Sequence, residues 1–462
     1  MAEDPSCPSI AHVGNTANNA FYNHLILMRS SKFTSLLPIE GFIRHAISSP
    51  AWEMVNFIVP SEQWVKAPEW QDFPEALELN NSYLRFKSAH EITGPVPKPT
   101  GNGVSHFART IGGKIPGAKS IRSLVRTQFW DLIRTRESHD SSIRILYGAE
   151  SIGHASPYAK GISVALEHGT LRWFADGPRN QRWTRRGYGR ALASASLIWL
   201  TNLDQRSLEV AEDVAPNRWV PFPHPYVPML RNQTVQPDLL WRSSILEQTG
   251  SEFLIMMPSS INWSSNHNKG TLVALEAFGQ LRSQRVPVAL QLSNWGLDIP
   301  KARAWIESRG LQHYVVWDHP QPRINLARRM ASADLVWDQF GLSAFGALAL
   351  RVCEVGVPLI SSPLSSDAVG IVGFQVPWYP ASTAQDIVHW TKRIIESRSG
   401  PDASRFTESY RRRAQAWLAE THAPRIAQSL QEEAYSALLG GETQLRTDSW
   451  KNTIHKFKLE SP

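Results

Sequence analysis

The chain has 462 residues, a net charge of +7, 42% apolar residues and 19% charged residues. This length is too great for one compact core and suits two domains, and the composition excludes a disordered chain. No apolar run approaches the roughly 20 residues of a membrane helix, and the acidic start lacks the layout of a secretory signal peptide. Cys7 and Cys353 fit neither a disulfide framework nor a zinc site. We therefore expect a cytoplasmic protein.

Short apolar runs alternate with helical patterns along the first half of the chain. The expected strands span 9–14, 54–59, 144–149, 161–169 and 197–202, and helical patterns span 18–30 and 186–196. This alternation is typical of a parallel sheet with crossover helices. We expect a first Rossmann-like domain over residues 1–228. The stretch 216–237 is rich in proline, which fixes φ and removes a backbone donor, so we expect a stiff, extended connector there.

The second half repeats the pattern. The expected strands span 252–258, 286–293, 314–319, 333–339 and 357–362, and the expected helices span 271–284, 301–310, 325–332 and 345–354. We expect a second doubly wound domain over residues 229–405, so that the fold class is α/β. Helices at 406–440 are expected to pack back on the first domain.

The tail, 441–462, places Trp450, Ile454 and Phe457 at helical spacing with lysines nearby. We favour a helix that packs on the protein itself or a disordered end, and keep contact with a membrane surface as the alternative. Arginine and lysine concentrate at 105–136 and 172–190. We favour a solvated basic face, with a surface for phosphate, anionic lipid or an acidic acceptor as the alternative. No nucleic-acid-binding signature accompanies this charge, so we expect no nucleic acid partner.

The stretch WDQFGLSAFG leads from the strand 333–339 into a helix. Free backbone amides at a helix N-terminus attract phosphate, Gly341 and Gly346 permit close backbone approach, and Ser343 suits a helix N-cap. Lys269 precedes a glycine in a loop after a strand, where its ammonium group would stabilise a bound diphosphate by about 1.5–3 kcal/mol. An ordinary strand–helix turn and a solvated lysine are the alternatives.

Six motifs, taken in order, resemble the retaining nucleotide-sugar glycosyltransferases of the GT-B fold, family four. They are HVGNTANNAFYN (12–23), GISVALEHGTLR (161–172), LIWLTN with WVPFPHP (197–225), NHNKGTLVALEAF (266–278), ADLVWDQFGLSAFGALALRVCEVGVPLI (333–360) and THAPRIAQSLQEEAYSALL (421–439). The resemblance implies GT-B architecture, with two doubly wound Rossmann-like domains facing an interdomain cleft. It also implies transfer of a sugar from a nucleotide-sugar to an acceptor hydroxyl with retention.

The resemblance also suggests partners and a setting. A nucleotide-diphosphate sugar would be the co-substrate, with no further cofactor, and the acceptor would be a sugar or a lipid-linked group. The setting would be polysaccharide or glycoconjugate biosynthesis, with peripheral contact at the inner membrane face. The sequence has no D-x-D pair for a metal–diphosphate clamp, so we expect metal-independent chemistry and no metal ligands.

Carried onto this sequence, the family's motifs give three sets of site residues. The expected catalytic residues are His168 and Arg172; the expected acceptor-binding residues are Asn18 and Asn19; the expected donor-binding residues are Lys269, Gly341, Ser343, Phe345, Gly346 and Arg351. A satisfied core histidine is the alternative for His168. Helix capping is the alternative for the two asparagines.

The donor helix departs from the family pattern of two glutamates eight positions apart, because Ser343 and Arg351 hold those positions. Eight helical residues rise about 12 Å, comparable with the reach from the sugar to the ribose. A guanidinium cannot accept the ribose hydrogen bonds, and the loss would be about 1.5–3 kcal/mol. Glu354 is offset by three residues, and Ser260 replaces a phosphate-binding arginine of the family.

Three interpretations follow from these departures. The first is an active transferase with altered donor recognition, in which Arg351 contacts a phosphate or a different sugar. The second is a degenerate homologue that acts as a binding or regulatory partner. The third is a GT-B enzyme of another type, such as a nucleotide-sugar epimerase. We favour the first, because the lysine, the histidine and the helix turn are all retained.

Overall fold

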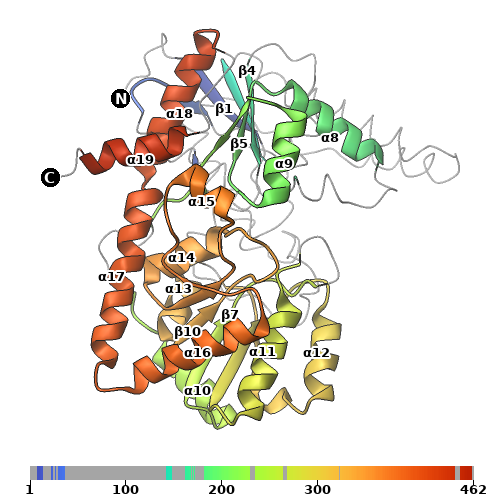
Figure 1. Cartoon of the computed structure of the whole chain (residues 1–462), viewed down its shortest axis with the longest axis vertical. Helices are drawn as coiled ribbons and strands as arrows, with labels where there is room; N and C mark the ends of the chain where they lie inside the picture. The colour runs from blue at the N-terminus through green and yellow to red at the C-terminus, as the bar shows by residue number, and fades with distance from the viewer. Residues whose placement is uncertain are drawn as a thin grey trace, which may run out of the picture.

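The computed structural model describes residues 8–13, 22–23, 26–27, 30–36, 142–147, 162–167, 169, 171, 182–228, 235–263, 268–321, 323–442 and 448–459. The expected strand 54–59 and the basic segment 105–136 lie outside the described residues. The described chain forms two parallel sheets of six strands each, with helices between the strands. Figure 1 shows one sheet above the other. This arrangement confirms the expected α/β class.

The first sheet has the order β2-β1-β3-β4-β5-β6, and with its helices we call it the N-terminal unit. Its elements are β1 Ser9–Val13, β2 Thr34–Leu36, β3 Ile143–Tyr147, β4 Ile162–Glu167, α8 Arg182–Ser194, β5 Leu197–Leu200, α9 Gln205–Val214 and β6 Trp219–Pro221. The strand β6 lies inside the stretch we expected to be a connector. Trp219 and Val220 are buried and pair with β5, and Pro221 is tolerated because β6 is at the edge of the sheet.

The second sheet has the order β12-β11-β10-β7-β8-β9, and with its helices we call it the C-terminal unit. Its strands are β7 Phe253–Met257, β8 Val288–Ser293, β9 Val315–Asp318, β10 Leu335–Trp337, β11 Leu359–Ser361 and β12 Tyr379–Pro380. Its helices are α10 Leu239–Thr249, α11 Thr271–Ser283, α12 Ile299–Ser308, α13 Arg323–Ser332, α14 Ala347–Val355, α15 Ser366–Val372 and α16 Ala384–Ser399, with a short 3-10 helix at Gln312–Tyr314. Each expected strand and helix of this half is present to within a few residues.

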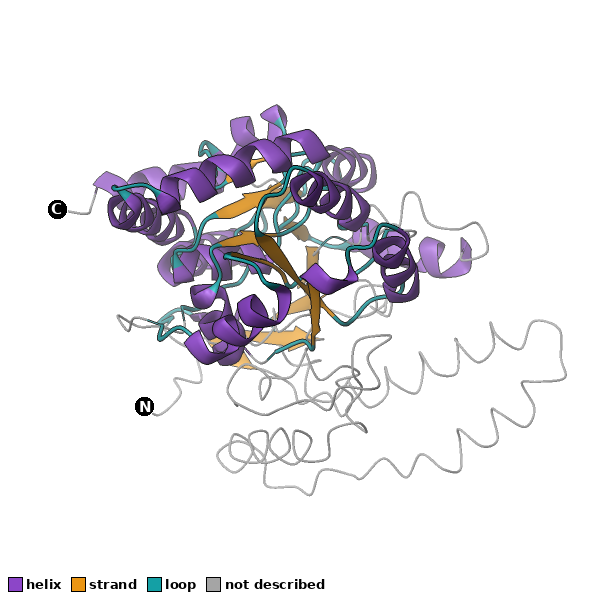
Figure 2. Ribbon diagram, turned by 90° about the horizontal axis from the view of Figure 1, so that it is seen from below, coloured by secondary structure: helices purple, strands orange, loops and turns teal. Residues whose placement is uncertain are grey.

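Side chains of the second sheet enter two different cores. Along β7, Leu254 and Met256 enter one core, while Ile255 and Met257 enter the other. This alternation follows from the period of two in a strand, and burial on both faces is the rule for parallel sheets. The helices α11, α12 and α16 contribute to one core, and α10, α13 and α14 to the other. Figure 2 shows helices on both sides of the strands.

The C-terminal helices connect the two units. The helix α17, Ala403–Thr421, packs in the C-terminal unit, and α18, Pro424–Leu439, packs in the core of the first sheet (Figure 1). Pro424 can start a helix but disfavours helical geometry at the residue before it, so the chain bends between α17 and α18. Gln431 and Tyr435 of α18 join buried hydrogen bonds that reach Asn23 and Trp199. The exact limits of the domains remain a prediction.

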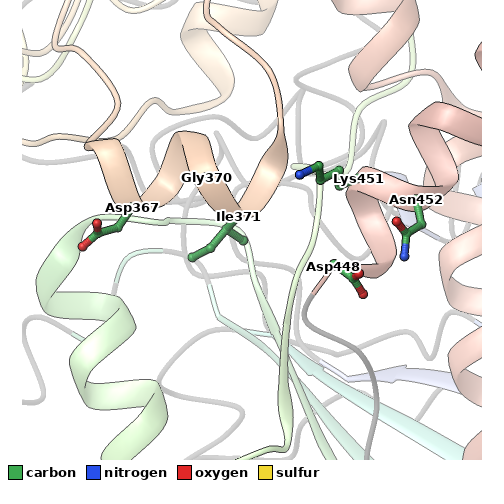
Figure 3. A pocket seen from close by; sticks show the side chains of 6 residues that line it. All are labelled: Asp367, Gly370, Ile371, Asp448, Lys451 and Asn452. Carbon is green, nitrogen blue, oxygen red and sulfur yellow. The ribbon is translucent and has the colours of Figure 1, made fainter.

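The tail forms a helix, α19, Ser449–Leu459. Trp450 and Ile454 are buried and Phe457 packs beside them, so this apolar face rests on the protein, as we favoured. A cavity of about 360 Å³ lies between α15 and α19; its lining residues are Asp367, Gly370, Ile371, Asp448, Lys451 and Asn452 (Figure 3). None of the residues expected in the site lines this cavity. In the described part of the chain, every helix is too short or too polar to span a membrane.

Candidate active site

The strand order of the second sheet reverses between β7 and β10. The strands β7, β8 and β9 follow one another toward one edge, and β10, β11 and β12 toward the other. In open parallel sheets, ligands bind beyond the carboxyl ends of the strands at such a point. The loop after β7 carries Lys269, and the loop after β10 carries Gly341 to Gly346. The topology therefore brings together the two loops that hold most of the expected donor residues.

These two loops touch backbone to backbone. Lys269 accepts a hydrogen bond at its carbonyl from the Phe340 amide at 2.9 Å. Gly270 has a φ of +74°, and a Cβ there would lie 2.7 Å from the Cβ of Phe340. A Cβ on Gly341 would lie 2.7 Å from the Asn268 carbonyl oxygen. Both glycines are therefore required for the contact between the loops.

The side chain of Gln339 holds both loops at once. Its Oε1 accepts a hydrogen bond from the Lys269 ammonium at 2.8 Å, and its Nε2 donates to the Ala344 carbonyl. Its own carbonyl accepts hydrogen bonds from the hydroxyls of Ser361 and Ser362. Gln339 is buried, so these bonds are shielded from water. The lysine and the turn that leads to α14 are thus fixed relative to each other.

A buried carboxyl group adjoins the lysine. Asp338 accepts a hydrogen bond from the Ser259 hydroxyl at 2.6 Å, and its other oxygen has no hydrogen-bond partner among the described residues. Burial raises the pKa of Asp338, and the Lys269 ammonium opposes that rise. The Lys269 ammonium therefore interacts with Asp338 as well as with Gln339.

The helix α14 begins at Ala347, two residues later than expected, with Gly346 as its N-cap. No side chain caps it, so the expectation that Ser343 would do so is wrong; Ser343 is exposed in the preceding turn. The first amides of a helix have no acceptor within the helix. A Cβ on Gly346 would meet nothing within 4 Å, so there is space beside the residue that precedes α14. Arg351 lies half-buried one turn further on.

The expected donor residue Phe345 has a buried ring and can offer a ligand only its backbone. Its ring packs against His224, which lies where the chain first passes between the units. It also packs against Trp417 and His422, which lie where the chain passes back at the end of α17. His224 Nε2 lies 3.1 Å from the Phe345 carbonyl, to which it donates a hydrogen bond. The junction of the units therefore contacts the turn before α14 directly.

The expected residues of the first sheet cannot be placed. His168, Arg172, Asn18 and Asn19 lie outside the described residues. The strand β4 ends at Glu167, whose buried carboxylate accepts a hydrogen bond from the Tyr188 hydroxyl of α8.

We did not predict roles for Glu167, Asp338 or Gln339. In each case the sequence offered one indication, which is a polar residue at or directly after the carboxyl end of an apolar strand.

Gly270→Ala should lower the free energy of unfolding more than Gly310→Ala. Both residues have positive φ, which alanine adopts less readily than glycine, so both variants carry this conformational cost. Only the methyl group at position 270 would also clash with backbone atoms. Overpacking of this kind costs about 1–3 kcal/mol beyond the shared loss. Urea unfolding of the two variants measures the difference, and equal losses would contradict the contact between the loops.

His224→Gln should make stability less dependent on pH. Burial lowers the pKa of His224 from 6.5 to about 4. Between these values the unfolded chain binds a proton that the folded protein excludes, so stability is full above pH 6.5 and falls as the pH drops toward 4. At about 1.4 kcal/mol per pKa unit, the loss is roughly 3 kcal/mol. Glutamine keeps a donor for the Phe345 carbonyl and does not titrate.

Urea unfolding at a series of pH values measures this slope. The exposed His455, on α19, supplies the control variant His455→Gln, which should keep the wild-type slope. A slope in His224→Gln as steep as in the wild type would assign the pH dependence to other groups. His422 is one of these, because burial and then His224 lower its pKa in the same direction.

The sequence matches no protein-family model, and no curated protein matches it. Several solved structures are similar in fold. HepE of Anabaena, in complex with UDP and glucose, has 14% identity and a TM-score of 0.56 over 93% of this chain and 100% of its own. Sucrose-phosphate synthase of Thermosynechococcus elongatus has 12% identity and a TM-score of 0.54, over 94% and 100%. A glycosyltransferase of Rickettsia africae has 11% identity and a TM-score of 0.51, over 94% and 99%.

At this level of identity the similarity establishes the fold. Two parallel sheets with alternating helices, matched over almost the whole chain, give this protein the GT-B architecture that the sequence motifs indicated.

Proposed function

We propose that this protein is a glycosyltransferase that transfers a sugar from a nucleotide-sugar to an acceptor hydroxyl, with retention and without a metal ion. One observation carries the proposal: the Lys269 ammonium and the turn before α14 are held together by Gln339 at the point where the strand order reverses. An ammonium group and the backbone amides at a helix N-terminus are groups that bind a diphosphate. HepE, which has the same fold, was solved with UDP bound.

In this proposal each unit has one task. The diphosphate of the donor lies on the amides at the start of α14 and on Lys269, so that the charge of the leaving group is stabilised where it develops. The acceptor lies on the N-terminal unit, near the expected residues Asn18, Asn19, His168 and Arg172. Closure of the units excludes water, and the acceptor attacks from the side on which the diphosphate leaves. Arg351 contacts a phosphate or the sugar, and the setting is the synthesis of a polysaccharide or glycoconjugate.

A second candidate function is that of a degenerate homologue, which acts as a binding or regulatory partner without catalysis. The environment of Lys269 favours it. Its ammonium already donates to Gln339 and interacts with the buried Asp338. Ser260, where the related enzymes carry an arginine, accepts a hydrogen bond from Asn262 and adds no positive charge. The retained contact between the loops favours the active enzyme, which we prefer.

Lys269→Met should weaken the binding of UDP and UDP-glucose at least about tenfold, because a charge-assisted contact is worth about 1.5–3 kcal/mol. Methionine keeps most of the length of the side chain and removes the charge together with the hydrogen bond to Gln339. Isothermal titration calorimetry measures the two affinities. The matched control is Lys456→Met, because Lys456 is exposed on α19, which packs in the core of the N-terminal unit. Equal affinities in the two variants would remove Lys269 from the proposed site.

The same titration with Arg351→Glu separates the two candidate functions. If the wild type binds a nucleotide and Arg351→Glu binds it less well, Arg351 belongs to a functional donor site. If only Arg351→Glu binds, the wild-type site has lost its ligand and the degenerate homologue is the better description.

A further inference from the structure

A buried arginine at the start of α13 connects distant parts of the chain. The side chain of Arg323 is 3% exposed, although its guanidinium remains charged at any physiological pH. Burial of such a charge is costly unless hydrogen bonds and an opposite charge compensate for it. The partners of Arg323 therefore indicate which parts of the molecule must stay in place around it.

The first partner belongs to the N-terminal unit. Arg323 Nη1 donates a hydrogen bond to the Tyr22 hydroxyl at 2.6 Å, although the two residues are 301 positions apart. Among the described residues, Tyr22 and Asn23 are helical, and so are Ile26 and Leu27; all four are buried. Asn23 donates a hydrogen bond to the Tyr147 hydroxyl at the end of β3, so the residue next to Tyr22 is anchored to the first sheet.

The second group of partners lies where the chain first passes between the units. Arg323 Nη2 donates to the Val227 carbonyl at 2.8 Å. The guanidinium carbon lies 5.3 Å from the centre of the Tyr22 ring and 5.1 Å from the centre of the Tyr226 ring. Both rings can stabilise the charge by cation–π attraction.

The third partner is on the helix that begins at the proposed diphosphate site. Glu354, in the last turn of α14, lies 3.4 Å from Arg323 Nη2 and accepts a hydrogen bond from the Tyr226 hydroxyl. Glu354 is the acid that the sequence places three residues beyond Arg351. In the structure it serves an ion pair between elements, which accounts for its offset from the position of a sugar-binding acid.

We propose that Arg323 is a positioning residue that fixes the orientation of the N-terminal unit relative to α14. We call Arg323, Tyr22, Tyr226, Val227 and Glu354 the arginine bridge. The planar guanidinium of Arg323 contacts the N-terminal unit, the residues where the chain first passes between the units, and α14 at the same time. A single point charge could not do this. The role in catalysis rests on the proposed function: a fixed orientation places an acceptor on one unit against a donor on the other.

The direct test measures the separation of the units without any nucleotide. Spin labels at Asp213→Cys on α9 and Glu307→Cys on α12, both exposed positions, report one distance between the units by double electron–electron resonance. The background carries Cys7→Ser, while the buried Cys353 is left in place. Two variants disturb the bridge. Tyr22→Phe removes the hydroxyl and keeps the ring, and Arg323→Lys keeps the charge and removes the planar guanidinium.

With the bridge intact, we expect one narrow distance distribution. Both bridge variants should add a second population at a different distance. The matched control is Tyr410→Phe, which removes a buried hydroxyl that accepts a hydrogen bond from the Leu359 amide within the C-terminal unit. The control should keep the parent distribution. If both bridge variants also keep it, Arg323 does not set the orientation and the proposal is overturned.

A second readout separates positioning from a structural role. Tyr22→Phe should leave the affinity for UDP unchanged, because Lys269 and the start of α14 both lie in the C-terminal unit. Its kcat with UDP-glucose should fall about tenfold or more, since small misplacements of reacting groups are costly. A loss of UDP affinity in this variant would contradict the proposal. If the wild type binds neither UDP nor another common nucleoside diphosphate, the proposed function fails, while the distance measurement still decides on the bridge.

Discussion

The site depends on the hydrogen bonds that one buried amide makes in two directions. Gln339 accepts from Lys269 and donates to the Ala344 carbonyl, so the loop after β7 and the turn after β10 are held as one body. The two loops are so close that Gly270 and Gly341 leave no room for a Cβ. A charged group and the turn before α14 are thereby held close together before a ligand arrives. Such preorganisation is the main way in which proteins stabilise developing charge.

Contacts between the units extend outward from this place. The carbonyl of Phe345, in the turn that Gln339 fixes, accepts a hydrogen bond from His224 at the first passage between the units. At the other end of α14, Glu354 pairs with Arg323, which reaches Tyr22 in the N-terminal unit. The helix that starts at the proposed donor site is thus connected to the N-terminal unit at both of its ends. The ion pair with Arg323 gives a physical reason for the position of Glu354, which lies three residues beyond Arg351.

The sequence predicted most of the C-terminal unit, because its strands are continuous apolar runs and its helices are well separated by glycine and proline. It did not predict β2 and β12, which have three and two residues and so show no period. The strand β6 was missed because its neighbouring prolines indicate an extended connector, and only pairing with β5 makes it a strand. The helix α14 was expected to begin at Phe345, but the ring of that residue is needed in the core before the helix starts.

The site was predicted only in outline. Lys269 and the turn 341–346 could be named from local patterns, whereas Gln339 acts through a contact across 70 positions that no local pattern contains. Ser343 has a side chain suited to an N-cap but lies outside the helix, since the turn is held by Gln339 instead. The bond between Arg323 and Tyr22 joins residues 301 positions apart, and only the folded chain brings them together.

The most direct test of the central claim is a crystal structure of the protein grown with UDP. We expect the diphosphate within hydrogen-bond distance of Lys269 Nζ and of the backbone amides at the start of α14, with Gln339 still bonded to the Ala344 carbonyl. A nucleotide bound elsewhere, or a site without nucleotide at saturating concentration, would contradict the assignment of these two loops as a diphosphate site.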